Sequence, residues 1–183
     1  MARAKVILVD ADVISHFIAT GHIFDLNKIL SPHHLLVVDK VYKEASYHPW
    51  DDKRKDDIDE WLARSNAEKI NFPSANRNIV HEFFKMKHEN PKLGDGERAC
   101  MAIAKYGGET IASSNFRDVA EYCEVNKIEY IGVLDILTIA KDKGYWTSEQ
   151  CNQLINDAIA TNQAKFPVGR IEDYKSDKDL SCF

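Results

Sequence analysis

Apolar residues in this chain fall into short runs that are separated by longer stretches with a helical repeat. The runs cover residues 5–9, 35–38, 69–72 (the weakest), 110–112 and 129–131. Runs this short and this rich in β-branched residues predict strands buried on both faces. Because amphipathic stretches alternate with them, the pattern predicts a parallel sheet with helices on both sides. We therefore expect a three-layer α/β/α fold with a parallel sheet of about five strands.

Capping residues, prolines and glycines delimit the helices between these runs. Helices are expected at residues 12–20, 24–30, 39–47, 51–64, 73–89, 94–106, 115–124, 133–143 and 147–160. From Asn162 onward the chain is polar, rich in Asp and Lys, and without a sustained repeat, which indicates a loosely held tail or a partner-binding arm. We expect one domain over residues 1–161 and a polar C-terminal tail over residues 162–183.

The composition is that of a globular protein, with 183 residues, 44% of them hydrophobic and 29% charged. No apolar stretch is long enough to cross a bilayer and no secretion signal is evident, which indicates a cytoplasmic protein without a membrane partner. The net charge of -5 argues against indiscriminate coating of nucleic acid. Four scattered cysteines without a CxxC pair indicate buried free thiols: Cys100, Cys123, Cys151 and Cys182.

Acidic residues follow several of the predicted strands. The first strand ends on Asp10 and Asp12, and Glu44 lies about one and a half turns into the helix after the second strand. Glu97 lies in the first turn of a helix with a glycine-rich entry, and Asp118 lies in the first turn after the fourth strand. Each acid taken alone is also explained by capping or by the stabilising effect of negative charge at a helix N-terminus.

Taken together, these acids suggest a metal site. The carboxyl ends of parallel strands meet at one edge of a sheet, so the acids are expected to lie close together. Like charges brought together cost stability unless a cation compensates them. Because all the donors are carboxylate oxygens, the set suggests Mg²⁺ or Mn²⁺.

The same positions resemble the motifs of PIN-domain nucleases. Asp10-Ala11-Asp12-Val13-Ile14 is similar to their opening Asp-x-Asn/Asp-Val-Ile/Leu, and Glu44 matches their helical Glu. Gly94-Asp95-Gly96-Glu97-Arg98-Ala99 resembles the Gly-Glu-x-x-Ala helix of a bacterial and archaeal, VapC-like branch. Ser113-Ser114-Asn115-Phe116-Arg117-Asp118 is similar to the Thr-x-Asn-x-x-Asp segment of PIN-domain nucleases, with Ser113 where Thr is usual. The stretch from Gly132 to Gly144 agrees with the Gly-x-Leu-x-x-Leu-x-x-Ala-Lys-x-x-Gly that follows the last strand in that branch. The resemblance runs from about residue 5 to residue 159.

The resemblance implies a Mg²⁺- or Mn²⁺-dependent ribonuclease. Many such proteins are toxins held in check by a cognate antitoxin, and a homodimer is expected. The implied catalytic residues are Asp10, Glu44, Glu97 and Asp118, of which Asp10, Glu97 and Asp118 would bind the metal. Three residues would orient these ligands from behind, although helix capping competes as their role: Asp12, Ser113 and Asn115.

An RNA substrate requires basic and aromatic groups on a chain of negative net charge. The candidates for binding nucleic acid are Lys40, Lys43, Lys53 and Arg54, with Trp50, Phe83 and Phe84 as faces for base stacking. Most surface lysines of this kind only solvate the protein.

Two other functions remain open from the sequence. An apolar strand ending in Asp-x-Asp also begins haloacid-dehalogenase-like phosphatases, and Gly94-Asp95-Gly96 resembles their late acidic motif. That motif here precedes Ser113-Ser114 instead of following it, and no lysine fits the expected role. The other alternative is a PIN-like fold whose weakened acid cluster serves as a surface for binding RNA or protein.

Overall fold

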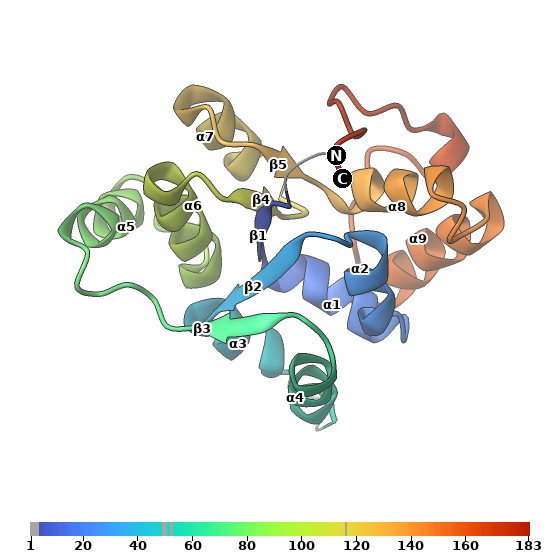
Figure 1. Ribbon diagram of the computed structural model, residues 1–183, viewed down its shortest axis with the longest axis horizontal. Helices are drawn as coiled ribbons and strands as arrows, with labels where there is room; N and C mark the ends of the chain where they lie inside the picture. Colours follow the sequence, from blue (N-terminus) through green and yellow to red (C-terminus); the bar gives the residue numbers. More distant parts are fainter. Residues whose placement is uncertain (1–3, 49–50, 52, 116) are drawn as a thin grey trace.

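The computed structural model describes residues 4–48, 51, 53–115 and 117–183, which form an open sheet with helices on both sides (Figure 1). The strands are β1 (Val6–Val9), β2 (His34–Val38), β3 (Glu68–Ile70), β4 (Thr110–Ala112) and β5 (Tyr130–Ile131). Their order in the sheet is β3-β2-β1-β4-β5, and every neighbouring pair is parallel. The predicted three-layer α/β/α fold is confirmed.

The helices of the described residues lie in two groups on either side of this sheet. One side carries α5 (Arg77–Glu89), α6 (Asp95–Gly107) and α7 (Asp118–Asn126). The other carries α1 (Ala11–Ala19), α2 (Ile23–Ile29), α8 (Val133–Asp142) and α9 (Ser148–Asn162) (Figure 1). Helix α3 (Asp39–Ser46) contacts both α1 and α6, and it also contacts α4 (Arg54–Arg64). Through these contacts α3 joins the two groups of helices.

Strand β1 is the centre of the sheet. Its residues Ile7, Leu8 and Val9 are fully buried, which explains why the run contains no polar side chain. The chain passes from β1 to β2 on one side and returns from β3 to β4 on the other, so the order of strands reverses between β1 and β4. Ligands of open α/β sheets bind beyond the carboxyl ends of the strands at such a point. The residues that follow the two strands there are Asp10 and Ser113.

Several boundaries differ from the sequence expectations by a few residues. Helix α5 begins at Arg77 instead of residue 73, because the side chain of Asn76 accepts hydrogen bonds from the backbone of Asn78 and Ile79 and caps the helix there. Helix α7 begins at Asp118 and not at residue 115. Strand β3 is a short, exposed edge strand, which explains its weak apolar pattern.

The segment after α9 does not form the loosely held tail that the sequence predicts. Helix α9 ends at Asn162, and the chain then packs back onto the domain, burying Ile171 and Phe183. The fully buried carboxylate of Asp135 accepts hydrogen bonds from three side chains of this segment: Tyr174, Ser176 and Lys178. The prediction was wrong because isolated apolar anchors and polar contacts, which leave no periodic pattern, hold the segment in place.

Two further expectations can be compared with the structure. Cys100, Cys123 and Cys151 are buried free thiols, as predicted, and Cys182 is a free thiol that is partly exposed. Among the residues that the structure describes, no helix is long and apolar enough to span a membrane.

Candidate active site

Asp10 lies at the carboxyl end of β1 and is 1% exposed. Its Oδ1 accepts a hydrogen bond from the backbone N–H of Ala11 at 2.7 Å, so Asp10 caps α1, and its Oδ2 accepts one from Ser113 Oγ at 2.9 Å. Burial, followed by the negative charges of Glu97 and Asp12, raises the pKa of Asp10 to about 8 against the opposing effect of these two hydrogen bonds. The site therefore holds more negative charge than the fold by itself compensates.

Glu97 is fixed at the first turn of α6 by contacts at both carboxylate oxygens. Its Oε2 accepts a hydrogen bond from the backbone N–H of Gly94, the N-cap residue of α6, at 3.0 Å, and its Oε1 accepts one from Asn115 Nδ2 at 2.7 Å. Asn115 follows β4, so this bond ties the helix to the neighbouring strand end. Both the capping role and the site role predicted for Glu97 are compatible with this geometry.

Glu44 reaches the same region from α3. Its Oε1 accepts a hydrogen bond from the backbone N–H of Gly96 at 3.1 Å, at the N-terminus of α6. Partial burial raises the pKa of Glu44, the N–H groups of Gly96 and Asp95 lower it, and the charges of Asp95 and Glu97 raise it, with a net upward shift. A Cβ on Gly96 would lie 2.5 Å from Glu44 Oε2, so glycine at this position lets the carboxylate approach the helix.

The charges of these three acids all act on one buried group. The thiol of Cys100, one turn along α6 from Glu97, is fully buried, and its pKa is raised by that burial and then by the charges of Asp10, Glu44 and Glu97. We refer to these three carboxylates as the acid cluster. Its donors are all oxygen atoms with surplus negative charge, which fits the chemistry of a hard divalent cation. Within the described part of the chain, however, no group of three or more Asp, Glu, His or Cys side chains is already arranged to hold a metal ion.

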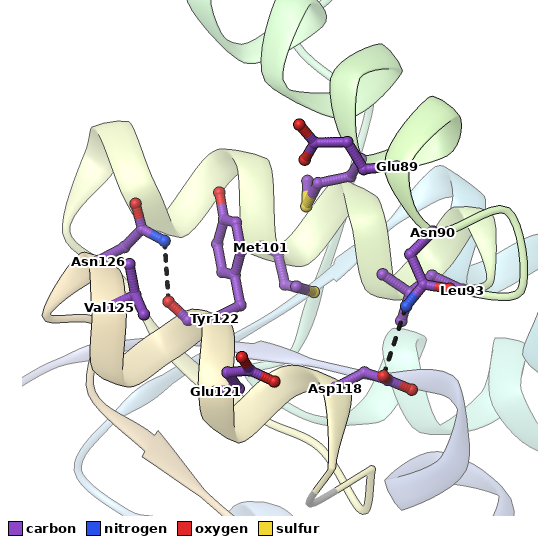
Figure 2. A pocket seen from close by; sticks show the side chains of 10 residues that line it. Glu89, Asn90, Leu93, Met101, Asp118, Glu121, Tyr122, Val125 and Asn126 are labelled. Carbon is purple, nitrogen blue, oxygen red and sulfur yellow. Dashed lines mark hydrogen bonds between the residues drawn. The ribbon is translucent and has the colours of Figure 1, made fainter.

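Asp118 is joined to the acid cluster through Asn115. Asn115 Nδ2, which donates to Glu97, also lies 3.5 Å from Asp118 Oδ2, and the backbone N–H of Asp118 donates to Asn115 Oδ1 at 3.4 Å. The other carboxylate oxygen of Asp118 accepts a hydrogen bond from Asn90 Nδ2 at 3.4 Å, at one end of a pocket between α5, α6 and α7 (Figure 2). Asp118 therefore lies at the margin of the cluster, with an amide between it and Glu97.

Comparison with known protein families accounts for this arrangement. A family model described as a PIN domain matches residues 6–166, from β1 to just beyond α9. The chain belongs to the PIN-domain family. The family consists of nuclease-type hydrolases, which generally use divalent metal ions. A search of curated proteins finds no significant match. Because the chain belongs to the PIN-domain family, the haloacid-dehalogenase-like alternative is wrong. Residues 167–183 lie outside the part of the chain that matches the PIN domain.

Asp12 of this PIN domain faces a polar cavity beside the acid cluster. The cavity has a volume of about 480 Å³ and is also lined by Glu44 and Arg54. Loss of solvent around Asp12 raises the pKa of its carboxyl, and the nearby guanidinium of Arg54 lowers it, with a net upward shift. Asp12 thus adds a fourth carboxylate near Asp10. This position is compatible with the predicted role of Asp12, which is to orient the carboxylates of the acid cluster.

The basic residues predicted to bind nucleic acid occupy different environments in the PIN domain. Lys40 and Lys43 line a hollow of about 710 Å³ next to Glu44, and Lys53 is exposed before α4. Arg54 is 5% exposed, so it lies in the wall of the Asp12 cavity and not on the open surface. Of the predicted stacking residues, Phe84 is exposed, Phe83 is buried and cannot offer a free face, and Trp50 lies outside the described residues.

Asn90 and His16 are among the residues of the site region that were not predicted from the sequence. Asn90, the residue that follows α5, contacts Asp118, and nothing in its local sequence indicates this role. His16 is buried in the wall of the Asp12 cavity. Its spacing of four residues from Asp12 on one helix places both on the same face, and this signal could have indicated it.

Proposed function

We propose that this PIN domain is a metal-dependent ribonuclease that hydrolyses RNA phosphodiester bonds at the acid cluster. The observation that carries the proposal is the buried carboxylate of Asp10, whose pKa is raised to about 8 by burial and by the charge of Glu97, at the point where the strand order reverses. Groups with pKa values displaced this far cluster at functional sites. A bound Mg²⁺ or Mn²⁺ would supply stabilisation of the charge on the scissile phosphate and a lower pKa for water.

Each site residue has a distinct task in this proposal. Asp10, Glu97 and Asp118 would hold the cation through their carboxylate oxygens, and Glu44 would add negative charge from the opposite helix. Ser113 and Asn115 donate hydrogen bonds to Asp10 and Glu97, respectively, and so fix the direction in which those carboxylates point. Their role, and that of Asp12, would be to orient the ligands and not to contact the substrate.

Substrate binding is assigned to the basic residues beside the cluster. Lys40 and Lys43 line the hollow next to Glu44, where they would attract the phosphates of a single-stranded RNA. Arg54 would face a phosphate from the cavity wall, and Lys53 would contribute from the exposed start of α4. We propose RNA and not DNA as the substrate because the Gly-Glu-x-x-Ala helix resembles that of the VapC-like branch.

The decisive experiment is cleavage of mixed single-stranded RNA in the presence of MnCl₂ or MgCl₂. We expect cleavage that is lost with EDTA and in the Asp10→Asn variant. The matched control is Asp142→Asn, which changes an exposed acid at the end of α8. RNA binding without any cleavage would instead support the binding-module alternative.

We also propose that the protein acts in the cytoplasm as a homodimer and as the toxin of a toxin–antitoxin pair. This proposal depends on the resemblance to the VapC-like branch. Growth arrest on expression of the wild-type chain, absent for Asp10→Asn, would support the toxin role. Light scattering would give the oligomeric state, and a monomer at all concentrations would contradict the dimer.

A further inference from the structure

The cavity beside Asp12 is lined by several polar side chains that have no role in the proposed metal site. Its walls come from α1, the end of α3, the start of α4 and the end of α9. Glu44 of the acid cluster and Asp12 beside it both line this cavity, so the cavity adjoins the cluster. The side chains that matter here are Ser15, His16, Tyr47, Arg54 and Asn162.

Arg54 provides a cation in the wall of this cavity. It is 5% exposed and is held rigidly, because Nε donates to the backbone carbonyl of Ala45 and Nη2 donates to Ser15 Oγ. Its Nη1 has no hydrogen-bond partner among the residues that the structure describes. Since a guanidinium has five N–H donors, this leaves Arg54 able to bind an anion such as a phosphate oxygen.

His16 and Asn162 form a second polar pair, although 146 residues separate them in the chain. Asn162 Nδ2 donates to the backbone carbonyl of Ser15 at 3.0 Å and lies 3.3 Å from His16 Nδ1. Burial and the charge of Arg54 lower the pKa of His16 to about 4, so its ring is neutral at pH 7. With Nδ1 accepting from Asn162, the ring proton is on Nε2.

The pair therefore leaves one donor and one acceptor without a partner in the protein. Neither His16 Nε2 nor Asn162 Oδ1 has a hydrogen-bond partner in the part of the chain described by the structure. The edge of a nucleobase carries both acceptors and donors, so it can pair with each of these two groups. At the mouth of the cavity, Tyr47 is 75% exposed and offers an aromatic face on which a base can stack.

We propose that this cavity binds the nucleotide adjacent to the scissile phosphate and reads its base. His16 and Asn162 hydrogen-bond to the base edge, Tyr47 stacks on the ring, and Arg54 faces a phosphate. The volume of about 480 Å³ is within the range of small-molecule sites. Because an unsuitable base leaves the buried His16 and the half-buried Asn162 without partners, the cavity discriminates among bases. This inference depends on the proposed ribonuclease function.

A binding experiment tests the cavity without cleavage. The Asp10→Asn protein is titrated with each of the four nucleoside 5′-monophosphates and followed by NMR. We expect one of them to bind at least about fivefold more tightly than the others, as one or two hydrogen bonds would provide. Adding Asn162→Ala, or the similarly sized His16→Gln, should abolish that preference, whereas adding Gln153→Ala on the exposed face of α9 should keep it. Equal binding of all four nucleotides, or a preference unchanged by both cavity variants, would overturn the proposal.

Sequencing of the cleavage products separates this inference from the proposed function. If the cavity reads a base, wild-type protein and Gln153→Ala cut RNA with the same base enriched at one position beside the cut, and Asn162→Ala loses the enrichment. If Asn162→Ala cuts with the same enrichment, the inference fails while the nuclease stands. If the wild-type protein cuts nothing, the nuclease proposal fails, and the nucleotide titration alone decides whether the cavity reads a base.

Discussion

Replacing Asp10 with asparagine removes a buried charge and preserves the contacts that surround it. Asp10 accepts hydrogen bonds from the backbone of Ala11 and from Ser113 Oγ. An asparagine carbonyl can accept the first bond, and its amide can donate to the Ser113 hydroxyl in place of the second. We therefore expect Asp10→Asn to stabilise the metal-free protein, although it removes a residue that the proposed reaction requires.

The magnitude follows from the displaced pKa. With a pKa of 3.8 in the unfolded chain and about 8 in the fold, folding at pH 7 costs up to about 4 kcal/mol, because a tenfold change in an ionisation constant corresponds to about 1.4 kcal/mol. Relaxation around the charge reduces this cost, so we expect a gain of about 1–3 kcal/mol for the variant. A protein of this size gains about 2–4 °C in Tm per kcal/mol.

The pH dependence has a definite sign. A carboxyl whose pKa is raised by folding binds its proton more tightly in the fold, so the wild-type protein loses stability as the pH rises from about 4 to about 8. The asparagine variant lacks this loss. The difference in Tm between the variant and the wild type should therefore be small at pH 5 and larger at pH 7.5.

Thermal unfolding in EDTA, followed by circular dichroism, measures this difference. Addition of MnCl₂ should raise the Tm of the wild type and not that of Asp10→Asn, because only a ligand that binds the folded state stabilises it. The exposed-acid variant Asp142→Asn should match the wild type throughout. A lower metal-free Tm for Asp10→Asn would refute the reasoning, since the carboxylate would then stabilise the fold by itself.

Three further substitutions test other parts of the structure. Gly96→Ala places a Cβ 2.5 Å from Glu44 Oε2, so we expect a loss of about 1–3 kcal/mol in chemical denaturation, and unchanged stability would contradict the close approach of α3 and α6. Asn115→Ala removes the amide that donates to Glu97 and should lower the cleavage rate by about 10–100-fold with the fold retained; an unaffected rate would exclude a positioning role. Hydrogen bonds outweigh burial and hold the pKa of Asp135 below its ordinary value, so its contribution to stability is present above about pH 4 and is lost as the pH falls. Asp135→Asn should lack this acid-sensitive stability in a denaturation series from pH 3 to 6, and identical pH profiles for the two proteins would show that the C-terminal segment does not depend on that charge.

The centre of the sheet was predictable because β1 and β4 are buried on both faces. The first run remains apolar until Asp10, so the end of the strand and the position of the first acid follow from the same change in pattern. The weakest predicted strand became β3, at the sheet edge, where exposure removes the constraint that makes a run continuous. Strand signals thus reflect burial, and they are clearest at the centre of the sheet, beside the site.

The spacing of Asp12 and His16 on one helix was readable, but the cavity as a whole was not predictable because its other members come from distant parts of the chain. His16 and Asn162 are 146 residues apart, and neither lies in a motif that indicates the other. Arg54 lies in the charged stretch Asp51-Asp52-Lys53-Arg54-Lys55, which is typical of a solvated surface. Its guanidinium is nevertheless buried and donates hydrogen bonds to Ala45 and Ser15. Contacts of this kind depend on tertiary packing, which local periodicity does not encode.

The acid cluster shows why capping and catalysis could not be separated from the sequence. A carboxylate has two oxygens, and at both Asp10 and Glu97 one oxygen accepts a backbone hydrogen bond at a helix start while the other accepts one from a side chain beyond β4. The cap therefore does not compete with the site. It fixes the direction of the carboxylate before any cation or substrate arrives, so the local sequence pattern that starts each helix also preorganises the acids.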